Sequence, residues 1–323
     1  MIPIRDTIES KNYPVVNSLI IGINVFLYFV SLAQGEAFNR FILLYGLVPA
    51  RYSVPHIADY FTFSQQVISF FSFMFLHGGF WHLLGNMWSL YIFGDNVEDS
   101  LGSLRYLLFY ILCGVASGLF HLIINWQSTI PTIGASGAIA GVMGAYILLY
   151  PRSKILTLIP IFFIPYFVEL SAFFFLGLWL VLQFINAAGS GAEGGGIAWW
   201  AHIGGFLFGI IFLKLFQLVP QLGVSHQVRR KTIRTKTPRL QAIHTVATGN
   251  DPHLYGSMTI TPNEAASGTK KLVNMPWAFQ KRLFSIKVPA GVRQGTTLRL
   301  VGMGRQMNGG RGDLYLRVLI RED

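Results

Sequence analysis

Charge is scarce in this sequence. Only 12% of its 323 residues are Asp, Glu, Lys or Arg, which is about half the fraction in an ordinary soluble domain. Cysteine is scarcer still, because Cys113 is the single example, and this excludes an internal disulfide and any cysteine-based zinc site. Hydrophobic residues make up 52% of the chain and the mean hydropathy is +0.49. The composition therefore directs attention to apolar runs long enough to span a membrane.

Apolar runs occur almost entirely before residue 220, and they predict an all-α polytopic membrane bundle of six transmembrane helices. The six are Val15–Ala33, Trp81–Val97, Leu104–Trp126, Ser136–Tyr150, Leu170–Asn186 and Ala198–Leu218. The run Ser136–Tyr150 is short for a span, which predicts a helix that begins part-way into the bilayer. Such a start is tolerated only where the preceding backbone is buried in protein or lines a wet cavity.

The distribution of Lys and Arg predicts the orientation of this bundle, because basic loops stay on the cytoplasmic side. Eleven basic residues share one side, against Arg40 and Arg51 on the other. The eleven are Arg5, Lys11, Arg105, Arg152, Lys154, Arg229, Arg230, Lys231, Arg234, Lys236 and Arg239. No cleavable signal peptide is evident, since the start is polar and the first apolar run is long enough to remain as a span. We expect an integral multi-pass protein of the bacterial inner (plasma) membrane, with cytoplasmic N- and C-termini.

Four segments follow from the change in composition along the chain. They are a cytoplasmic N-terminus (1–14), the helical domain (15–220), a basic linker (221–252) and a small soluble all-β domain (253–323). In the last segment "DLYLRVLI" alternates between polar and apolar residues, and Gly and Pro punctuate the strands. The linker run "RRKTIRTKTPR" fits either nucleic acid or anionic lipid, and beside a membrane domain we favour lipid and expect no nucleic-acid partner.

Polar residues inside a bilayer need a reason, and "HGGFWHLLGNMW" contains His82 and Asn86 among such residues. His82 and Asn86 are four residues apart, so a helix places them on one face, one turn from each other. Either side chain could donate a hydrogen bond to a group at that level. The alternative is a pair that bonds between helices of the bundle.

Ser136 lies among small residues in "IGASGAIAG", at the expected start of the fourth apolar helix and after Pro131 and Gly134. The first N–H groups of a helix have no internal partner and carry the positive end of its dipole. A hydroxyl at that point is therefore beside donors for a developing oxyanion. The alternative is a packing seam with a capping serine, and Gly137, Gly141 and Ala145 do continue at a spacing of four.

His202 begins a third polar cluster, "AHIGGFLFG", near the start of the sixth run. Gly205 and Gly209 follow on one face, so this helix can lie flush against the fourth and bring the imidazole to Ser136. A serine becomes a nucleophile when a base lies within hydrogen-bonding reach. Glu169 is the nearest acid by type, and we expect it toward the inner end of the fifth span, so the pattern indicates a Ser-His dyad. The alternative is a histidine bonded within the bundle.

The three clusters, in this order over residues 10–218, make the membrane part similar to the rhomboid family of intramembrane serine proteases. The resemblance implies that Ser136 is the nucleophile and His202 the general base. It further implies that Asn86 and His82 form the oxyanion hole, while Gly134, Gly137, Gly205 and Gly209 allow close packing around the site. The implied substrates are transmembrane proteins, reached from the lipid bilayer between the second and fifth spans. No metal or other cofactor is implied.

Two departures from the family pattern concern how the site is arranged. Some members have an aromatic residue four positions after the serine, where it packs against the histidine. This sequence has Ala140 there, so another group must orient His202. The first loop, residues 34–76, lacks the Trp-Arg pair of many members and has "LVPARY" instead.

The last 71 residues resemble the C-terminal substrate-binding region of DnaJ-type co-chaperones. The similarity rests on "ITPNEAASGTKK", "VPAGV" and "GDLYL". The sequence has no HPD signature and no cysteine-rich zinc module, so recruitment of an Hsp70-type ATPase is not supported. The resemblance implies that this domain binds an extended peptide or a protein partner. The alternative is a folded appendage that aids assembly.

Two other functions compete with the protease. A non-catalytic rhomboid-like protein that binds membrane clients would lack the serine or the histidine, and both are present here. A transporter would need broken helices in repeated halves, and we find no such internal symmetry. We therefore predict an intramembrane serine endopeptidase.

Overall fold

In the computed structural model the chain divides into two compact units, Met1–Ile233 and Arg234–Asp323, each with its own hydrophobic core. The structure describes residues 1–161, 164–189, 197–220, 232–233, 237, 240–243, 245–247, 249, 251–277, 280–307 and 310–321. Most of the basic run 229–239, predicted to contact lipid, lies outside these residues.

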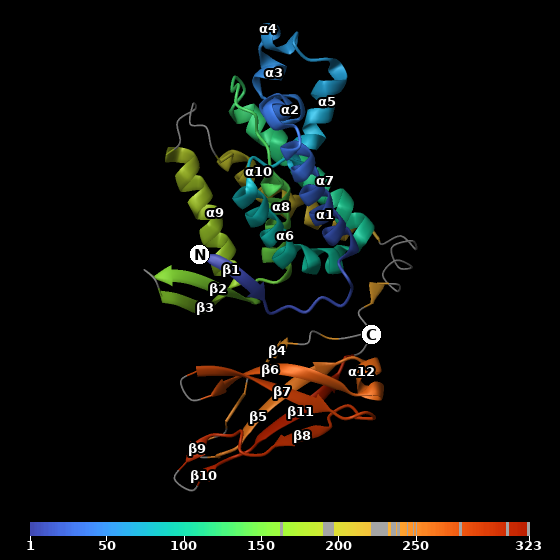
Figure 1. Ribbon diagram of the computed structural model, residues 1–323, viewed down its shortest axis with the longest axis vertical. Helices are drawn as coiled ribbons and strands as arrows, with labels where there is room; N and C mark the ends of the chain where they lie inside the picture. The colour runs from blue at the N-terminus through green and yellow to red at the C-terminus, as the bar shows by residue number, and fades with distance from the viewer. Residues whose placement is uncertain are drawn as a thin grey trace. The chain divides into compact units, whose positions relative to one another are not determined.

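The first unit is a helical bundle with a small sheet at one end (Figure 1). Its helices are α1 (Val15–Leu32), η1 (Gly35–Ala37), α2 (Phe38–Tyr45), α3 (Ala50–Ser53), α4 (Pro55–Ala58), α5 (Phe63–Ser72), η2 (Phe73–Phe75), α6 (Phe80–Leu101), α7 (Ser103–Ile124), α8 (Ser136–Leu149), α9 (Ala172–Gly189) and α10 (Trp199–Leu218). Its strands are β1 (Ile2–Asp6), β2 (Lys154–Ile161) and β3 (Ile164–Ser171).

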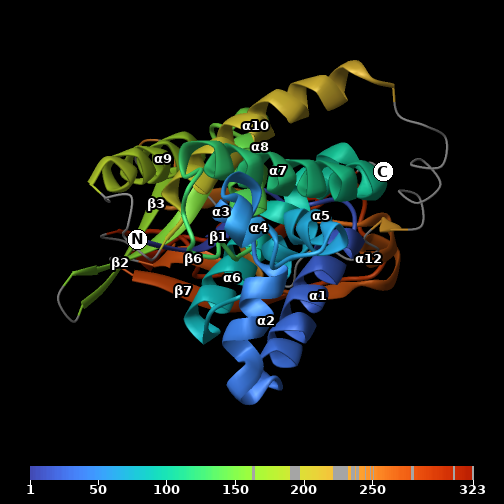
Figure 2. The ribbon, with the colours of Figure 1, turned by 90° about the horizontal axis from the view of Figure 1, so that it is seen from above.

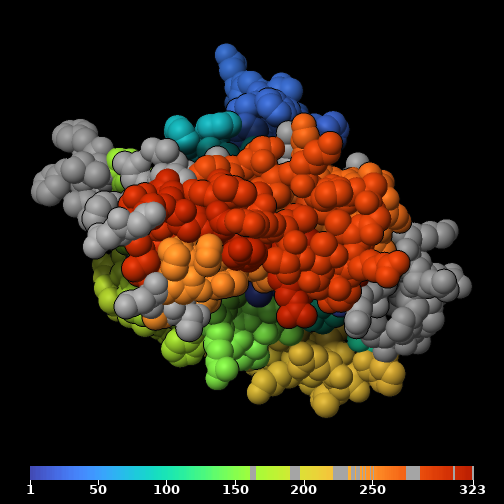
Figure 3. Space-filling view, turned by 90° about the horizontal axis from the view of Figure 1, so that it is seen from below, coloured from blue at the N-terminus to red at the C-terminus, as the bar shows by residue number. Residues whose placement is uncertain are grey.

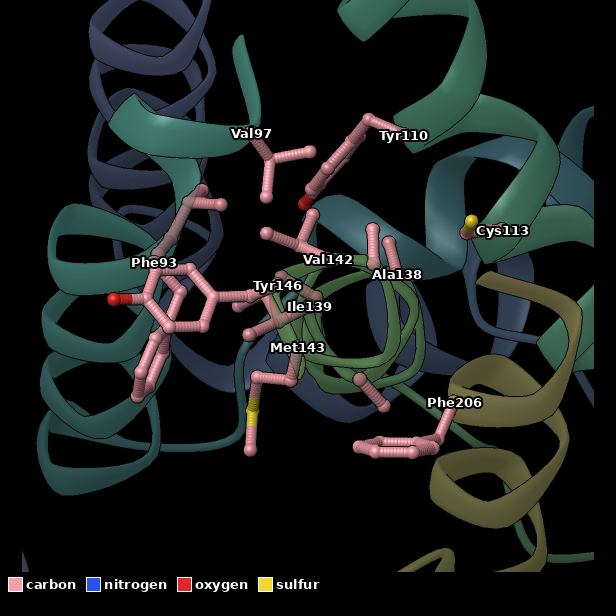
Figure 4. Close-up of a cluster of buried hydrophobic side chains, with 14 of the residues drawn as sticks. Phe93, Val97, Tyr110, Cys113, Ala138, Ile139, Val142, Met143, Tyr146 and Phe206 are labelled. Carbon is pink, nitrogen blue, oxygen red and sulfur yellow. The ribbon is translucent and has the colours of Figure 1, made fainter. Parts of the chain in front are cut away.

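Helix α8 is the centre of this bundle. Every residue from Gly137 to Ile147 is buried, as expected for a helix that is apolar on all sides. Helices α6, α7 and α10 all pack against it (Figure 2). Figure 4 shows the result, with Phe93 of α6, Tyr110 of α7 and Phe206 of α10 converging on the side chains of α8.

Glycines bring α8 and α10 into backbone contact. A Cβ at Gly205 would lie 2.0 Å from the Gly137 carbonyl oxygen, and one at Gly209 would lie 2.1 Å from that of Gly141. A Cβ at Gly144 would likewise lie 2.2 Å from the Phe206 carbonyl oxygen. Real Cβ atoms do not approach this closely, so only glycine permits this separation of the two helices.

Four described helices are long and apolar enough to cross a membrane: α1, α7, α9 and α10. A fifth candidate is the pair Phe63–Phe75 and Phe80–Leu101, which passes the same test together but is bent by 75°. The remaining helix, α8, has 14 residues and is about 21 Å long, below the thickness of a hydrocarbon core. The six predicted spans are therefore not confirmed; the structure supports a bundle with four or five.

The prediction that the membrane part is all-α is wrong, because residues 154–161 and 164–171 form two β-strands. Strand β2 pairs antiparallel with β3 and with β1, in the order β1-β2-β3. Pro160 and Pro165 face each other in the register and exclude a helix interior, while the β-branched and aromatic neighbours favour strands. The fifth apolar helix consequently begins at Ala172, two residues after the predicted Leu170.

Two acidic side chains join the helices at the end of the bundle away from Ser136. The Glu98 carboxylate accepts hydrogen bonds from the backbone N–H groups of Val16 and Asn17, at 3.1 and 2.7 Å, and so caps α1. Asp6 of β1 accepts from Asn96 Nδ2 at 2.7 Å and from the Tyr146 hydroxyl. The strand β1 is thereby tied to both α6 and α8.

The second unit is a β-domain with two three-stranded sheets and a short hairpin, whose packed surface is orange to red in Figure 3. One sheet has the order β5-β11-β8 and the other β4-β6-β7. The strands are β4 (Leu240–Ala242), β5 (Leu254–Ile260), β6 (Thr269–Trp277), β7 (Gln280–Val288), β8 (Thr297–Leu300), β9 (Gln306–Met307), β10 (Gly310–Arg311) and β11 (Leu314–Ile320).

The alternation predicted for "DLYLRVLI" is present, since Leu314, Leu316 and Val318 are fully buried on one face of β11. The unit is not strictly all-β, because α12 (Pro262–Ser267) interrupts it. Thr261 and Glu264 form a capping box around a proline in the first turn, which is a strong local signal for a helix start. Residues of the expected linker also belong to this unit, since Gln241 and Ile243 are buried in it.

Glu264 is the polar centre of the second unit. Its carboxylate accepts hydrogen bonds from the Thr237 hydroxyl at 2.8 Å, from the Thr261 N–H at 3.1 Å and from the buried Lys271 ammonium. Burial by itself would raise the pKa of Glu264, but the bonds from Lys271, Thr237 and Thr261 outweigh it, and the pKa is lowered. The carboxylate is therefore held ionised within the fold.

We predict that Gly209→Ala destabilises the bundle by about 1–3 kcal/mol, because α10 must move away from α8 to admit a methyl group. Gly177 on α9 has open space around it, so Gly177→Ala is the matched control and should be neutral or slightly stabilising. Unfolding in mixed micelles with a rising fraction of SDS measures both variants. Equal unfolding midpoints for the two variants would contradict the close backbone contact between α8 and α10.

We predict that Asp6→Asn removes a pH dependence of stability. Burial is the main reason that the pKa of Asp6 is raised to about 7. A folded-state pKa above the unfolded value contributes stability that is complete below about pH 4 and is lost as the pH rises through about 7. The thermal midpoint in detergent, measured from about pH 5 to about pH 8, should fall in the wild type and stay flatter in the variant. If the thermal midpoints of the wild type and the variant change with pH in parallel, Asp6 is not the source of the pH dependence.

We predict that Glu264→Gln destabilises the second unit by about 3–5 kcal/mol at neutral pH, because it leaves the Lys271 ammonium buried without a counter-charge. Hydrogen exchange of the β5 and β11 amides in the full chain reports this loss. Since the folded-state pKa of Glu264 is lowered, its contribution is present above the unfolded value near 4.5 and is lost as the pH falls below it. The difference between wild type and variant should therefore shrink in acid.

Candidate active site

Ser136 and His202 meet where α8 and α10 begin. Ser136 is the first residue of α8 and His202 lies in the first turn of α10. The distance between Ser136 Oγ and His202 Nε2 is 2.8 Å, a hydrogen bond. The backbone contact of Gly205 with Gly137, one residue after the serine, holds the two helix starts at this separation.

The imidazole of His202 is buried, at 8% exposure, and is held on its other side by α9. Its Nδ1 lies 2.8 Å from Oε1 of Gln183. The ring of Trp179 lies 5.8 Å from the imidazole, centroid to centroid, with the two planes tilted by 30°. The ring of Trp199 lies 6.1 Å away in a T-shaped arrangement. Three side chains besides Ser136 therefore restrict the orientation of this ring.

Gln183 and Trp179 were not among the residues selected from the sequence. The available signal was Gln183 itself, because a polar residue in the apolar run Leu170–Asn186 needs a partner. Nothing in the local pattern says that this partner is His202 on another helix. Ala140, four residues after Ser136, lies against Gly205 and carries no ring to pack on the histidine.

His82 and Asn86 of α6 face the loop before Ser136. Gly134 has a φ of +127°, and a Cβ there would lie 2.7 Å from His82 Nε2 and 3.6 Å from Asn86 Nδ2. A side chain at this position would thus displace His82 and contact Asn86. Asn86 Nδ2 is buried and has no hydrogen-bond partner among the described residues, so a donor is left available at the site.

The loop before Ser136 is anchored by backbone hydrogen bonds. Leu47 and Thr132 exchange two of them, at 3.0 and 2.8 Å, and the Gly134 N–H donates to the Phe73 carbonyl at 2.9 Å. These bonds satisfy irregular backbone beside an apolar bundle. The N–H groups of the first turn of α8 remain without intrahelical acceptors.

A cavity of about 580 Å³ joins these groups. Ser136, His202, His82 and Asn86 all line it, together with Ser117 and His121 of α7. Its size admits a short peptide segment and water. Glu169 lies on β3 and does not line this cavity. Among the described residues no group of three or more His, Cys, Asp or Glu could hold a metal ion.

Two parts of the amino-acid sequence match models of known protein families. Residues 64–217 match the family model "Rhomboid domain", and residues 253–323 match "DnaJ C terminal domain". The first unit carries a rhomboid domain. The resemblance predicted from the motifs is thus confirmed for both parts of the chain.

Similar proteins come from several eukaryotes. "Rhomboid protein 1, mitochondrial" of Saccharomyces cerevisiae is 32% identical over 203 residues, or 60% of this chain and 51% of that protein. "RHOMBOID-like protein 1" of Arabidopsis thaliana is 27% identical, covering 59% and 43%. "Presenilin-associated rhomboid-like protein, mitochondrial" of Bos taurus is 26% identical, covering 55% and 46%. The chain thus spans about half the length of the curated relatives that it matches.

These names overturn the predicted location. Three of the similar proteins are designated mitochondrial and a fourth, from Arabidopsis thaliana, chloroplastic. The expectation of a bacterial inner membrane with cytoplasmic termini is therefore wrong on this comparison, and the names of three relatives point to mitochondria. Lys and Arg counts report the side of a membrane but not which membrane it is.

Proposed function

We propose that the rhomboid domain is an intramembrane serine endopeptidase that hydrolyses peptide bonds in or near the transmembrane segments of membrane proteins. The observation that carries the proposal is the 2.8 Å hydrogen bond from Ser136 Oγ to His202 Nε2 inside a 580 Å³ cavity. A serine hydroxyl in contact with a neutral imidazole is the arrangement that nucleophilic catalysis needs.

In the first half of the reaction Ser136 Oγ attacks the scissile carbonyl carbon while His202 Nε2 accepts the hydroxyl proton. The carbonyl oxygen becomes an oxyanion. We assign its stabilisation to Asn86 Nδ2, to His82 and to the N–H groups at the start of α8, which also carry the positive end of the helix dipole. His202 then gives the proton to the leaving amine nitrogen, the C–N bond breaks, and an acyl group remains on Ser136.

In the second half a water molecule attacks the acyl carbon and loses a proton to His202 Nε2. The same donors stabilise the second oxyanion. When the ester bond to Ser136 breaks, the proton returns from His202 to Oγ, and the new carboxyl end of the substrate leaves. The dyad is restored and no metal or other cofactor enters the proposed reaction.

For the second unit we propose that it binds an extended peptide or a protein partner. The support is its match to the DnaJ C terminal domain and its independent hydrophobic core. The role would be delivery of substrate segments to the rhomboid domain, or retention of its products.

We predict that Ser136→Ala and His202→Ala each reduce cleavage of a single-span membrane protein in liposomes by at least about 1,000-fold. Ser117→Ala and His121→Ala are the matched controls, because these residues line the same cavity from α7, and both should keep activity within about tenfold. Labelling by a fluorophosphonate should depend on Ser136 in the same way. Cleavage that survives Ser136→Ala would refute the proposal.

A chain that ends after residue 233 tests the role of the second unit in the same assay. Unchanged cleavage of the transmembrane substrate would exclude substrate delivery. If the full-length wild type cleaves no substrate and takes no fluorophosphonate label, the alternative of a non-catalytic protein that binds membrane clients gains support instead.

A further inference from the structure

Gln183 is a buried polar residue in a lipid-facing helix, and both ends of its amide are used. The side chain is 5% exposed, while its neighbours Leu182 and Phe184 are exposed on the outside of α9. Its Nε2 donates to the Trp179 carbonyl at 3.1 Å, and its Oε1 lies 2.8 Å from His202 Nδ1. The cost of burying an amide in this setting is offset only when both groups are paired.

The contact with Trp179 decides which way the amide is turned. A backbone carbonyl can only accept a hydrogen bond, so the amide nitrogen must face Trp179 and the amide oxygen must face His202. An amide oxygen in turn can only accept, which requires a proton on His202 Nδ1. In a neutral imidazole the lone pair is then on Nε2, the atom that faces Ser136 Oγ.

Trp179 and Gln183 are one helical turn apart, so α9 presents both to the same ring. The Trp179 ring lies 5.8 Å from the His202 ring, centroid to centroid, and the Gln183 amide oxygen accepts a hydrogen bond from His202 Nδ1–H. Helix α8 offers no equivalent support, because Ala140 is in contact with Gly205 and carries only a methyl group. The orientation of His202 is thus determined from α9 and not from the helix that carries the serine.

We propose that Gln183 is a positioning residue for the protease reaction, a neutral third member that sets the tautomer and orientation of His202, with Trp179 as its packing support. This inference rests on the proposed function. A neutral amide does not compensate the charge of a protonated imidazole as a carboxylate would, so its contribution is orientation. Loss of the contact should therefore lower kcat and leave substrate binding almost unchanged.

The test compares three variants of the full chain in liposomes. Gln183→Met keeps the volume and removes the acceptor, and we expect kcat to fall about 10- to 100-fold with KM within about twofold. Gln183→Glu keeps an oxygen acceptor toward Nδ1 and should recover most of that loss. Asn186→Leu is the control, because Asn186 is exposed on the same helix and its amide donates to the Leu182 carbonyl. It should retain wild-type kcat.

A second measurement does not depend on activity. In protein labelled with ¹⁵N-histidine, the His202 signals, assigned with His202→Ala, should show Nδ1 protonated and Nε2 unprotonated near neutral pH. Gln183→Met should produce a mixture of tautomers, and Asn186→Leu should not. Unchanged tautomer signals in Gln183→Met would overturn the inference.

The two proposals fail in different ways. A wild type whose cleavage does not depend on Ser136 refutes the protease, and the tautomer measurement still judges the role of Gln183. A wild type that cleaves through Ser136, together with a Gln183→Met variant as active as Asn186→Leu, refutes the role of Gln183 alone.

Discussion

The backbone contact between α8 and α10 is the constraint on which the rest of the first unit depends. Glycines on both helices remove the side chains that would separate them. They are Gly137, Gly141 and Gly144 on α8 and Gly205 and Gly209 on α10. In an apolar solvent this close approach gains dispersion contacts that bulkier residues would not allow. It also fixes the distance between the first turns of the two helices, and therefore the distance from Ser136 to His202.

Two clusters of polar groups lie toward the two ends of α8. At one end are Ser136, His202 and Gln183, at the other Tyr146 with Asp6 of β1. Between them α8 is buried among apolar side chains. This separation allows one short helix to hold a reactive hydroxyl in a wet cavity while its other end is tied to the sheet. A full-length span could not place its first turn at that depth.

The second unit follows the rules of a water-soluble domain. Its core is built from alternating strand residues, and a buried ion pair, Lys271 with Glu264, is completed by hydrogen bonds from Thr237 and Thr261. A buried charge pair of this kind tolerates no loss of a partner. The two units therefore differ in which residues they bury and expose. The first unit has the pattern of a protein in lipid, and the second has that of a protein in water.

Much of this architecture could be predicted from the amino-acid sequence alone. Apolar runs locate the helices to within a few residues, because burial in lipid needs continuous hydrophobicity, and alternation identifies β11 because strands have a period of two. Strands β2 and β3 were not predicted, because their apolar run does not alternate clearly between polar and apolar residues. Ser136, His202, His82 and Asn86 stood out because polar residues in apolar segments are conspicuous.

Only the tertiary structure decided how these residues are arranged. In the sequence Gln183 is one polar residue in an apolar run. Packing of α9 against α10 places its Oε1 2.8 Å from His202 Nδ1. The same holds for Asp6, whose partners Asn96 and Tyr146 are 90 and 140 residues away. Local pattern reports which face of a helix is polar, because it depends on periodicity. Which helix supplies the partner depends on packing between segments distant in sequence, and no local pattern contains that information.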